Sequence, residues 1–121
     1  MQNRHALDER PINIVDRDEA FLEKLDALIV ENISNTTFSV KDMEQSLGYS
    51  RSSFNRKVNS LLNMSPNEYL RHRRLTYAAQ MLGRKNCRVS DVCYKVGFNS
   101  PSYFAKCFKE KFGVLPADYS H

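Results

Sequence analysis

The sequence predicts an all-α fold in which two helix-turn-helix lobes are joined by a long linking helix, with about seven helices in all. Three observations predict it. Apolar residues recur at helical spacing through most of the 121-residue chain, and no convincing strand pattern occurs. Residues 40–69 and 89–119 carry one pattern twice, about fifty positions apart. Near the end of the first copy, a serine followed by proline marks the start of a long helix that leads to the second.

The repeat pairs residues of similar type at corresponding positions. The pairs are Val40 with Val89, Asp42 with Asp91, Gly48 with Gly97, Tyr49 with Phe98, Ser50 with Ser100, Phe54 with Phe104, Pro66 with Pro116, and Tyr69 with Tyr119. In each copy a short amphipathic segment ends at a glycine and an aromatic residue. A polar turn with serine follows, and a second, more basic segment begins. This order is typical of a helix-turn-helix.

The chain is expected to begin with an irregular segment. Residues 1–17 have no sustained hydrophobic period and include Pro11, so we interpret them as a linker or an added extension. The folded domain is then expected over residues 18–121. From Asp18 to Ile33 the apolar residues follow helical spacing, which predicts a support helix.

The first helix-turn-helix is expected over about residues 39–62. Ser39, with Asp42 three residues later, is an N-cap arrangement for the leading helix. Gly48 can adopt the left-handed conformation that ends this helix. Ser50 is the expected cap of the second helix.

The linking helix is expected over about residues 66–83. Ser65 is a cap, Pro66 suits the first helical position, and Gly83 ends the helix. Such a helix spans roughly 25 Å at ~1.5 Å per residue. Because one turn of DNA is ~34 Å long, a spacer of this size could present both second helices to successive major grooves.

The second helix-turn-helix is expected over about residues 89–113. Gly97 and Phe98 form its turn, and Ser100 with Pro101 begins its second helix. The apolar side chains Phe54, Phe104, Phe108 and Phe112 recur at helical spacing and are expected in the core.

Charge is distributed unevenly along the chain. Residues 1–49 hold five Lys/Arg and ten Asp/Glu, whereas residues 50–121 hold thirteen Lys/Arg and four Asp/Glu. A basic second part indicates a polyanionic partner, with a solvated lysine-rich face as the alternative.

Other classes of site have little support in the sequence. Cys87, Cys93 and Cys107 form no C-x-x-C pair and have no ligand spacing with a histidine, so we expect no zinc, no cofactor and no disulfide framework. No apolar run approaches the roughly 20 residues needed to span a bilayer. We therefore expect a cytoplasmic protein without membrane contact. An enzyme is disfavoured, because no phosphate-binding glycine loop, activated nucleophile or paired carboxylates occur.

One set of residues is similar to the signature of a known family. It comprises Gly97-Phe98, Ser102-Tyr103-Phe104, Lys106, Phe108-Lys109, Phe112-Gly113, Pro116 and Tyr119. Together with the repeat, these residues resemble the AraC/XylS-type bacterial transcription regulators from about Asp18 to Tyr119. The resemblance implies an all-helical domain with two helix-turn-helix lobes that binds double-stranded promoter DNA through both second helices. It also implies RNA polymerase as a partner.

Candidate DNA-contacting residues follow from the resemblance and from side-chain chemistry. Carried over by position, the base-reading residues would be Ser52, Asn55 and Arg56 in the first helix and Ser102, Tyr103 and Lys106 in the second. Arginine suits guanine and asparagine suits adenine, so Arg56 and Asn55 are the leading candidates for direct readout. The candidates for phosphate contact are Ser50, Arg51, Lys57, Ser100 and Lys109. Each has a structural alternative as an ordinary exposed polar residue.

Arg71, Arg73 and Arg74 form a basic run on the linking helix. We interpret Arg74 as a structural residue, an internal ion-pair partner of Asp91 or Glu68. His72 is interpreted as a surface residue, because no second ligand accompanies it.

The predicted function is sequence-specific DNA binding in transcription regulation. We expect the output domain of a larger sensor or two-component regulator, with an upstream regulatory domain. The alternatives are a stand-alone small activator and a basic helical module that binds an acidic protein. The repeat favours a tandem DNA reader, because a protein partner does not require two recognition helices at a fixed displacement. The sequence names neither the inducing signal nor the regulated genes.

Overall fold

The computed structural model describes residues 12–84 and 87–119, and only the backbone of residues 12–15. Within these ranges it contains seven α-helices and no strand, which confirms the predicted fold class. The helices are α1 (Ile12–Glu31), α2 (Val40–Leu47), α3 (Arg51–Leu62), α4 (Pro66–Leu82), α5 (Val89–Lys95), α6 (Pro101–Phe112) and α7 (Pro116–Tyr119). None of these helices is long and apolar enough to cross a bilayer.

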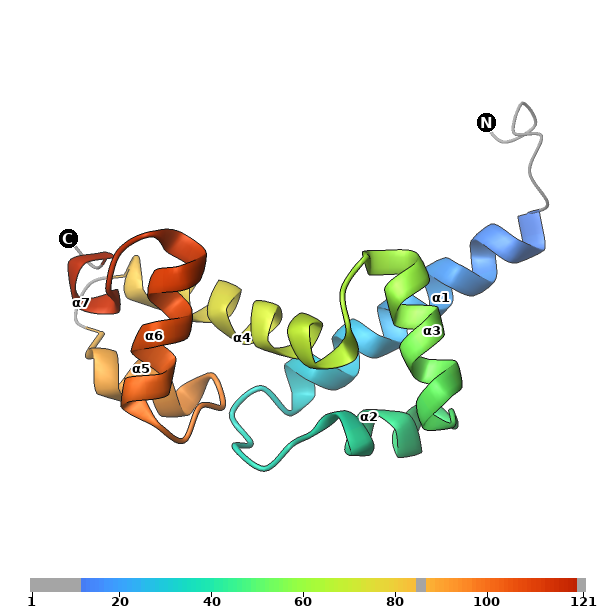
Figure 1. The fold of residues 1–121 in the computed structure, drawn as a ribbon, viewed down its shortest axis with the longest axis horizontal. Coiled ribbons are helices and arrows are strands. Elements are labelled where there is room, and N and C mark those ends of the chain that lie inside the picture. The colour runs from blue at the N-terminus through green and yellow to red at the C-terminus, as the bar shows by residue number, and fades with distance from the viewer. Residues whose placement is uncertain (1–11, 85–86, 120–121) are drawn as a thin grey trace.

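The helices form two lobes at opposite ends of α4 (Figure 1). The first lobe contains α1, α2 and α3 around the beginning of α4. The second contains α5, α6 and α7 around its end. The helix-turn-helix units of the two copies are therefore α2–α3 and α5–α6, and α4 belongs to both lobes.

The first helix begins earlier than the sequence predicted. We expected residues 1–17 to be irregular, but α1 begins at Ile12. Asp16 and Arg17 lie inside this helix and are exposed. These two charged residues contribute no hydrophobic period that would reveal the helix. Residues 1–11 lie outside the described part of the chain.

Serine caps fix the starts of α2 and α4. The hydroxyl of Ser39 accepts a hydrogen bond from the Asp42 backbone N–H at 3.4 Å, and the Asp42 carboxylate accepts one from the Ser39 backbone N–H at 2.9 Å. Ser65 and Glu68 make the same reciprocal pair at 3.1 and 2.8 Å. These bonds satisfy N–H groups that have no partner within the helix. Both predicted caps are confirmed.

Residues in the left-handed conformation end α2 and α3. Gly48 ends α2 with φ 77°, as expected. Asn63 ends α3 with φ 56° and is the only described residue other than glycine with positive φ. Asparagine tolerates this conformation better than most side chains. The resulting turn leads directly to the Ser65 cap of α4.

Each lobe has its own hydrophobic core. The core of the first lobe is built around Phe54 and Val58 of α3, with Tyr69 and Leu70 from the beginning of α4. Its further buried members are Phe21, Leu25, Ile29, Phe38 and Met43. Ile33, at the end of the first lobe, packs against both cores.

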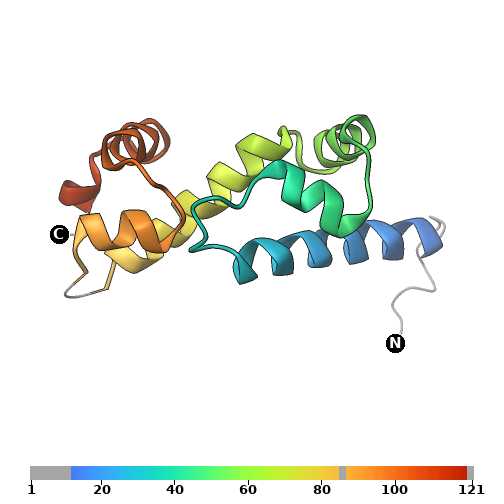
Figure 2. The same cartoon turned by 90° about the horizontal axis from the view of Figure 1, so that it is seen from below.

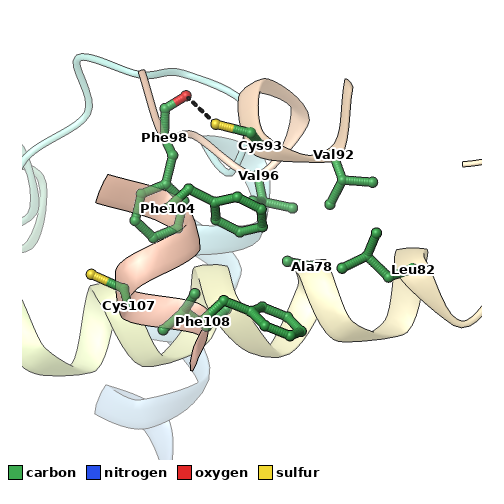
Figure 3. Packing of buried hydrophobic residues seen from close by; sticks show 10 residues of the cluster. Ala78, Leu82, Val92, Cys93, Val96, Phe98, Phe104, Cys107 and Phe108 are labelled. Carbon is green, nitrogen blue, oxygen red and sulfur yellow. Dashed lines mark hydrogen bonds between the residues drawn. The ribbon is translucent and has the colours of Figure 1, made fainter. Parts of the chain in front are cut away.

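The core of the second lobe uses the end of α4 (Figure 3). Its buried residues are Leu75, Ala78, Leu82, Val92, Cys93, Val96, Phe98, Phe104, Cys107 and Phe108. The Cys93 thiol lies 3.8 Å from the carbonyl oxygen of Phe98 and hydrogen-bonds to it. Cys93 and Cys107 are buried in this core, where each packs as a small hydrophobic side chain.

Candidate nucleic-acid interface

The second helices of the two units, α3 and α6, lie on the same side of the molecule. Figure 2 shows both nearly end-on along the upper edge of the molecule, while α1 runs along the lower edge. Each buries one face in its own lobe. Phe54 and Val58 fill this role in α3, and Phe104 and Phe108 in α6. The opposite faces of the two helices are therefore free and point in a common direction.

The outward face of α3 carries the three predicted base-reading residues. Ser52, Asn55 and Arg56 are all exposed. In the described part of the chain, their side chains make no hydrogen bond or ion pair. A long cationic side chain and a short amide side chain are thus available to a ligand approaching this face.

The corresponding residues of α6 are less uniform. Ser102 and Lys106 are exposed, and the Ser102 hydroxyl lies 3.3 Å from that of Ser100. Tyr103 is 48% exposed, and its ring centre lies 6.1 Å from that of Phe98. The neighbouring Cys107 side chain raises the pKa of Tyr103. Tyr103 therefore lies at the flank of α6 that faces α4.

The predicted phosphate-contacting hydroxyls are helix caps. Ser50 accepts a hydrogen bond from the Ser53 backbone N–H at 3.2 Å, and Ser100 accepts one from Tyr103 at 3.2 Å. A hydroxyl that accepts a bond can still donate its own proton to an anion. The cap therefore leaves the donor of Ser50 available, whereas the Ser100 hydroxyl also pairs with that of Ser102, where either oxygen can be the donor.

The three predicted phosphate-contacting cations differ in their surroundings. Lys57 Nζ lies 3.3 Å from an Asp18 carboxylate oxygen and 5.2 Å from the centre of the Phe21 ring, so it binds α1. Arg51 has 77% of its side chain exposed and lies 3.9 Å from Glu44. Lys109 is exposed on the outward face of α6. Arg51 and Lys109 are the freer pair.

The charge of both second helices is positive. Arg51, Arg56 and Lys57 lie in α3, which contains no carboxylate. The cations of α6 are Lys106, Lys109 and Lys111, against the single acid Glu110. A polyanion approaching this side meets two parallel cationic helices.

A groove between the lobes contains residues that were not predicted as contacts. It is lined by Asn67 and Arg71 of α4, together with Asn99 and Tyr103 of the second lobe. Asn67 and Arg71 are one helical turn apart, so they share a face of α4. The predicted start of α4 at Pro66 was enough to place Asn67 and Arg71 on one face of the helix. Nothing in the sequence indicated that Asn99 and Tyr103 of the second lobe face them.

The ion pair predicted for Arg74 is wrong. Its Nη2 donates instead to the backbone carbonyls of Asn35 at 3.1 Å and Phe38 at 3.3 Å. The carboxylate of Glu68 is held by the Ser65 cap, and Asp91 is exposed on α5. Periodicity along α4 cannot identify partners that are backbone atoms of a loop.

His72 packs against α6. Its Nδ1 lies 2.7 Å from Lys111 Nζ. Partial burial, followed by the positive charge of Lys111, lowers the pKa of His72. The unprotonated Nδ1 of a neutral imidazole can accept a hydrogen bond from the Lys111 ammonium, so the pair joins α4 to α6.

A family model described as "Helix-turn-helix domain" matches residues 43–121. Three individual proteins that resemble the chain are also relevant. Histidine kinase P4 of Formosa agariphila is 38% identical over 110 residues, covering 91% of this chain and 8% of that protein. The transcriptional activator AarP of Providencia stuartii is 35% identical over 88 residues, covering 73% of this chain and 64% of that protein. The chain thus spans less than two thirds of either relative.

One of the solved structures that match is the DNA-binding domain of AdpA, a global transcriptional factor, in complex with a target DNA. It has a TM-score of 0.76 and 27% sequence identity. The similarity covers 82% of this chain and 88% of that domain.

Proposed function

The chain belongs to the AraC-type helix-turn-helix family of DNA-binding transcription regulators, and from this premise we propose that α3 and α6 enter two successive major-groove segments of one promoter. The observation that carries the proposal is that α3 and α6 lie along the same edge of the molecule (Figure 2) and that both carry exposed polar and cationic residues. Because both helices come from one chain, the site is two-part and non-palindromic. A symmetric dimer of single motifs would instead require a palindrome.

The length of α4 suits this arrangement. Its 17 residues span roughly 25 Å at ~1.5 Å per residue. The two lobes lie at opposite ends of this helix, and its length is of the order of the ~34 Å of one DNA turn. A single rigid helix therefore supplies most of the spacing that two successive major grooves require.

Within α3 we assign direct readout to Arg56 and Asn55. The Arg56 guanidinium can bond O6 and N7 of one guanine, and the Asn55 amide can bond N6 and N7 of one adenine. Ser52 is small and permits several bases. These three side chains are exposed and make no hydrogen bond or ion pair among the described residues, so none of these bonds has to break on binding.

Within α6 we assign base contact to Lys106 and Ser102, with Tyr103 at the edge of the same groove. Arg51 and Lys109 are assigned to phosphates, together with the hydroxyl donors of Ser50 and Ser100. We assign Lys57 to the packing of α3 on α1 instead, because its ammonium is paired with Asp18.

We further propose that this domain is the output part of a larger bacterial regulator acting in the cytoplasm. The match to a protein named as a histidine kinase, of which the chain spans 8%, supports a two-component regulator with an upstream sensory region. RNA polymerase is the proposed partner at the promoter. The match to AarP over 64% of its length favours a stand-alone small activator as the second candidate. No catalytic step is required in either case.

Selection of duplexes from a random pool by the purified chain tests the DNA-binding proposal. Sequencing of the retained DNA at near-physiological salt should show two short motifs about one helical turn apart. Retention without any motif, lost as salt rises, would favour the basic protein-interaction module instead.

Substitution of Arg56 tests the assignment of individual residues. Arg56→Ala should weaken binding to the selected site by about 1–3 kcal/mol and relax the preference at one base pair. The control is Lys24→Ala, which removes one positive charge from an exposed position of α1, outside the two second helices. Equal losses for Arg56→Ala on selected and random DNA would contradict base readout.

A further inference from the structure

The junction between the lobes contains one arginine that contacts both of them. Arg74 lies near the middle of α4, after Leu70 of the first core and before Ala78 of the second. We infer that Arg74 is a positioning residue that fixes the angle between the lobes, and through it the spacing of the two DNA motifs. The effect on the spacing of the DNA motifs rests on the proposed function, whereas the effect on the angle between the lobes does not.

The contact to the first lobe is made with backbone oxygens. Arg74 Nη2 donates to the carbonyls of Asn35 and Phe38, at 3.1 and 3.3 Å. Both belong to the loop that joins α1 to α2. The Phe38 side chain is buried in the first core. The guanidinium therefore holds a loop whose position is fixed by the packing of its own lobe.

The contact to the second lobe is made with the backbone of Gly97. A Cβ placed on Gly97 would lie 2.6 Å from Arg74 Nε and 2.5 Å from the carbonyl oxygen of Ile33. Both distances are far below van der Waals contact, so only glycine permits this approach. The turn of the second helix-turn-helix thus packs directly against the Arg74 guanidinium and against the backbone at Ile33, just after α1.

The position of Gly97 is transmitted to α6. Gly97 has φ 96° and is followed by Phe98, which is buried. The Phe98 ring lies 5.1 Å from the ring of Phe104, one of the residues that seat α6 in its lobe. A movement of Gly97 relative to the first lobe would therefore tilt or shift α6 relative to α3.

The guanidinium is enclosed at this junction. Its Nε is buried and has no hydrogen-bond partner among the described residues, and desolvation lowers the pKa of Arg74. Arg73, the preceding residue, also has a buried Nε without a partner among the described residues, but its Nη2 donates to the Tyr77 hydroxyl of the same helix at 3.2 Å. Among the described residues Arg73 makes no hydrogen bond to either lobe's loops, so it provides a control of equal charge.

The first half of the inference is tested without DNA. Nitroxide labels are attached at Ser60→Cys and Glu110→Cys, exposed and equivalent positions of α3 and α6, in a Cys87→Ser background. Pulsed electron paramagnetic resonance on the parent protein should give one narrow distribution of the distance between the two labels. Arg74→Met should broaden it, because the apolar chain cannot bond the two carbonyls, whereas Arg73→Met should leave it narrow. A distribution for Arg74→Met as narrow as that of the parent would overturn the inference.

The second half is tested on DNA carrying the two selected motifs at varied spacing. The second motif should strengthen binding over a single motif on the order of 100-fold at the best spacing, and much less when base pairs are added or removed. Arg74→Met should flatten this spacing profile without changing affinity for a single motif. A uniform loss at every spacing, single motif included, would show that Arg74 only supports folding.

The two proposals fail in different ways. If no two-part site exists, the spacing profile is flat already for the parent protein, while the distance distributions still decide whether Arg74 fixes the lobes. Should Arg74→Met fail to fold by circular dichroism, Arg74→Lys gives the same comparison. Lysine keeps the charge and the stem but lacks the planar fork of donors.

Discussion

A hydrogen bond between α4 and α1 gives a stability prediction that can be worked from the structure. The Tyr69 hydroxyl donates to an Asp26 carboxylate oxygen at 2.5 Å, and Tyr69 is 9% exposed. Hydrogen bonds to charged groups are worth ~1.5–3 kcal/mol. Because Asp26 is half-buried, water will partly replace the lost donor. We expect Tyr69→Phe to lower the free energy of unfolding by about 1–2 kcal/mol at pH 7.

The same bond makes this loss depend on pH. Burial, followed by the hydrogen bond to Asp26, raises the pKa of Tyr69 to about 12, from the ordinary value of about 10. A raised pKa means that the folded state favours the protonated hydroxyl. The stabilisation is therefore complete below pH ~10 and is lost as pH rises from ~10 to ~12. A rise of this size corresponds to ~2.7 kcal/mol, which we reduce by about half because the bond lies near solvent.

Urea denaturation of the parent and of Tyr69→Phe, followed by circular dichroism at several pH values, measures both effects. The difference between the two proteins should shrink above pH ~10, since only the parent loses this contribution. Tyr94→Phe is the matched control, because Tyr94 is exposed on α5 and its hydroxyl makes no hydrogen bond among the described residues. A difference of less than ~0.3 kcal/mol at pH 7, or one that stays constant up to pH 11, would refute the reasoning.

Three further predictions concern the core and the cations. Phe104→Ala should lower the free energy of unfolding by about 3–5 kcal/mol, because the ring is fully buried; thermal unfolding measures this, and a loss below ~1 kcal/mol would contradict the packing. Lys109→Ala should weaken binding to selected and random DNA alike and reduce the salt slope by about 1 in titrations at varied salt; a loss confined to the selected site would oppose phosphate contact. Lys57→Ala should cost roughly 0.2–1 kcal/mol of stability and change DNA affinity less than Arg51→Ala does; the reverse order of affinities would return Lys57 to the interface.

Features decided by neighbours along the chain were predictable from the sequence. The caps at Ser39 and Ser65 are made by residues three positions away, and both occur as expected. The buried faces of α3 and α6 follow from the spacing of Phe54, Val58 and Phe104. Local bonding and a regular period are both written directly in the sequence.

Features decided by distant parts of the chain were not predictable. Arg74 bonds to the carbonyl of Asn35, which lies 39 positions earlier and offers a backbone atom that carries no signal of residue type. Lys57 lies on a flank of α3 that happens to face Asp18 of α1. Asp16 and Arg17, near the beginning of α1, are exposed and show no hydrophobic period. Each error arises where tertiary packing, not local pattern, selects the partner.

In the proposed complex, one chain reads two adjacent major-groove segments. Hydroxyl-radical footprinting of the purified chain on its selected duplex tests it most directly. We predict two protected patches on one face of the duplex, with centres ~10 base pairs apart. A single patch covering one major groove would contradict the tandem reader, whatever the affinity.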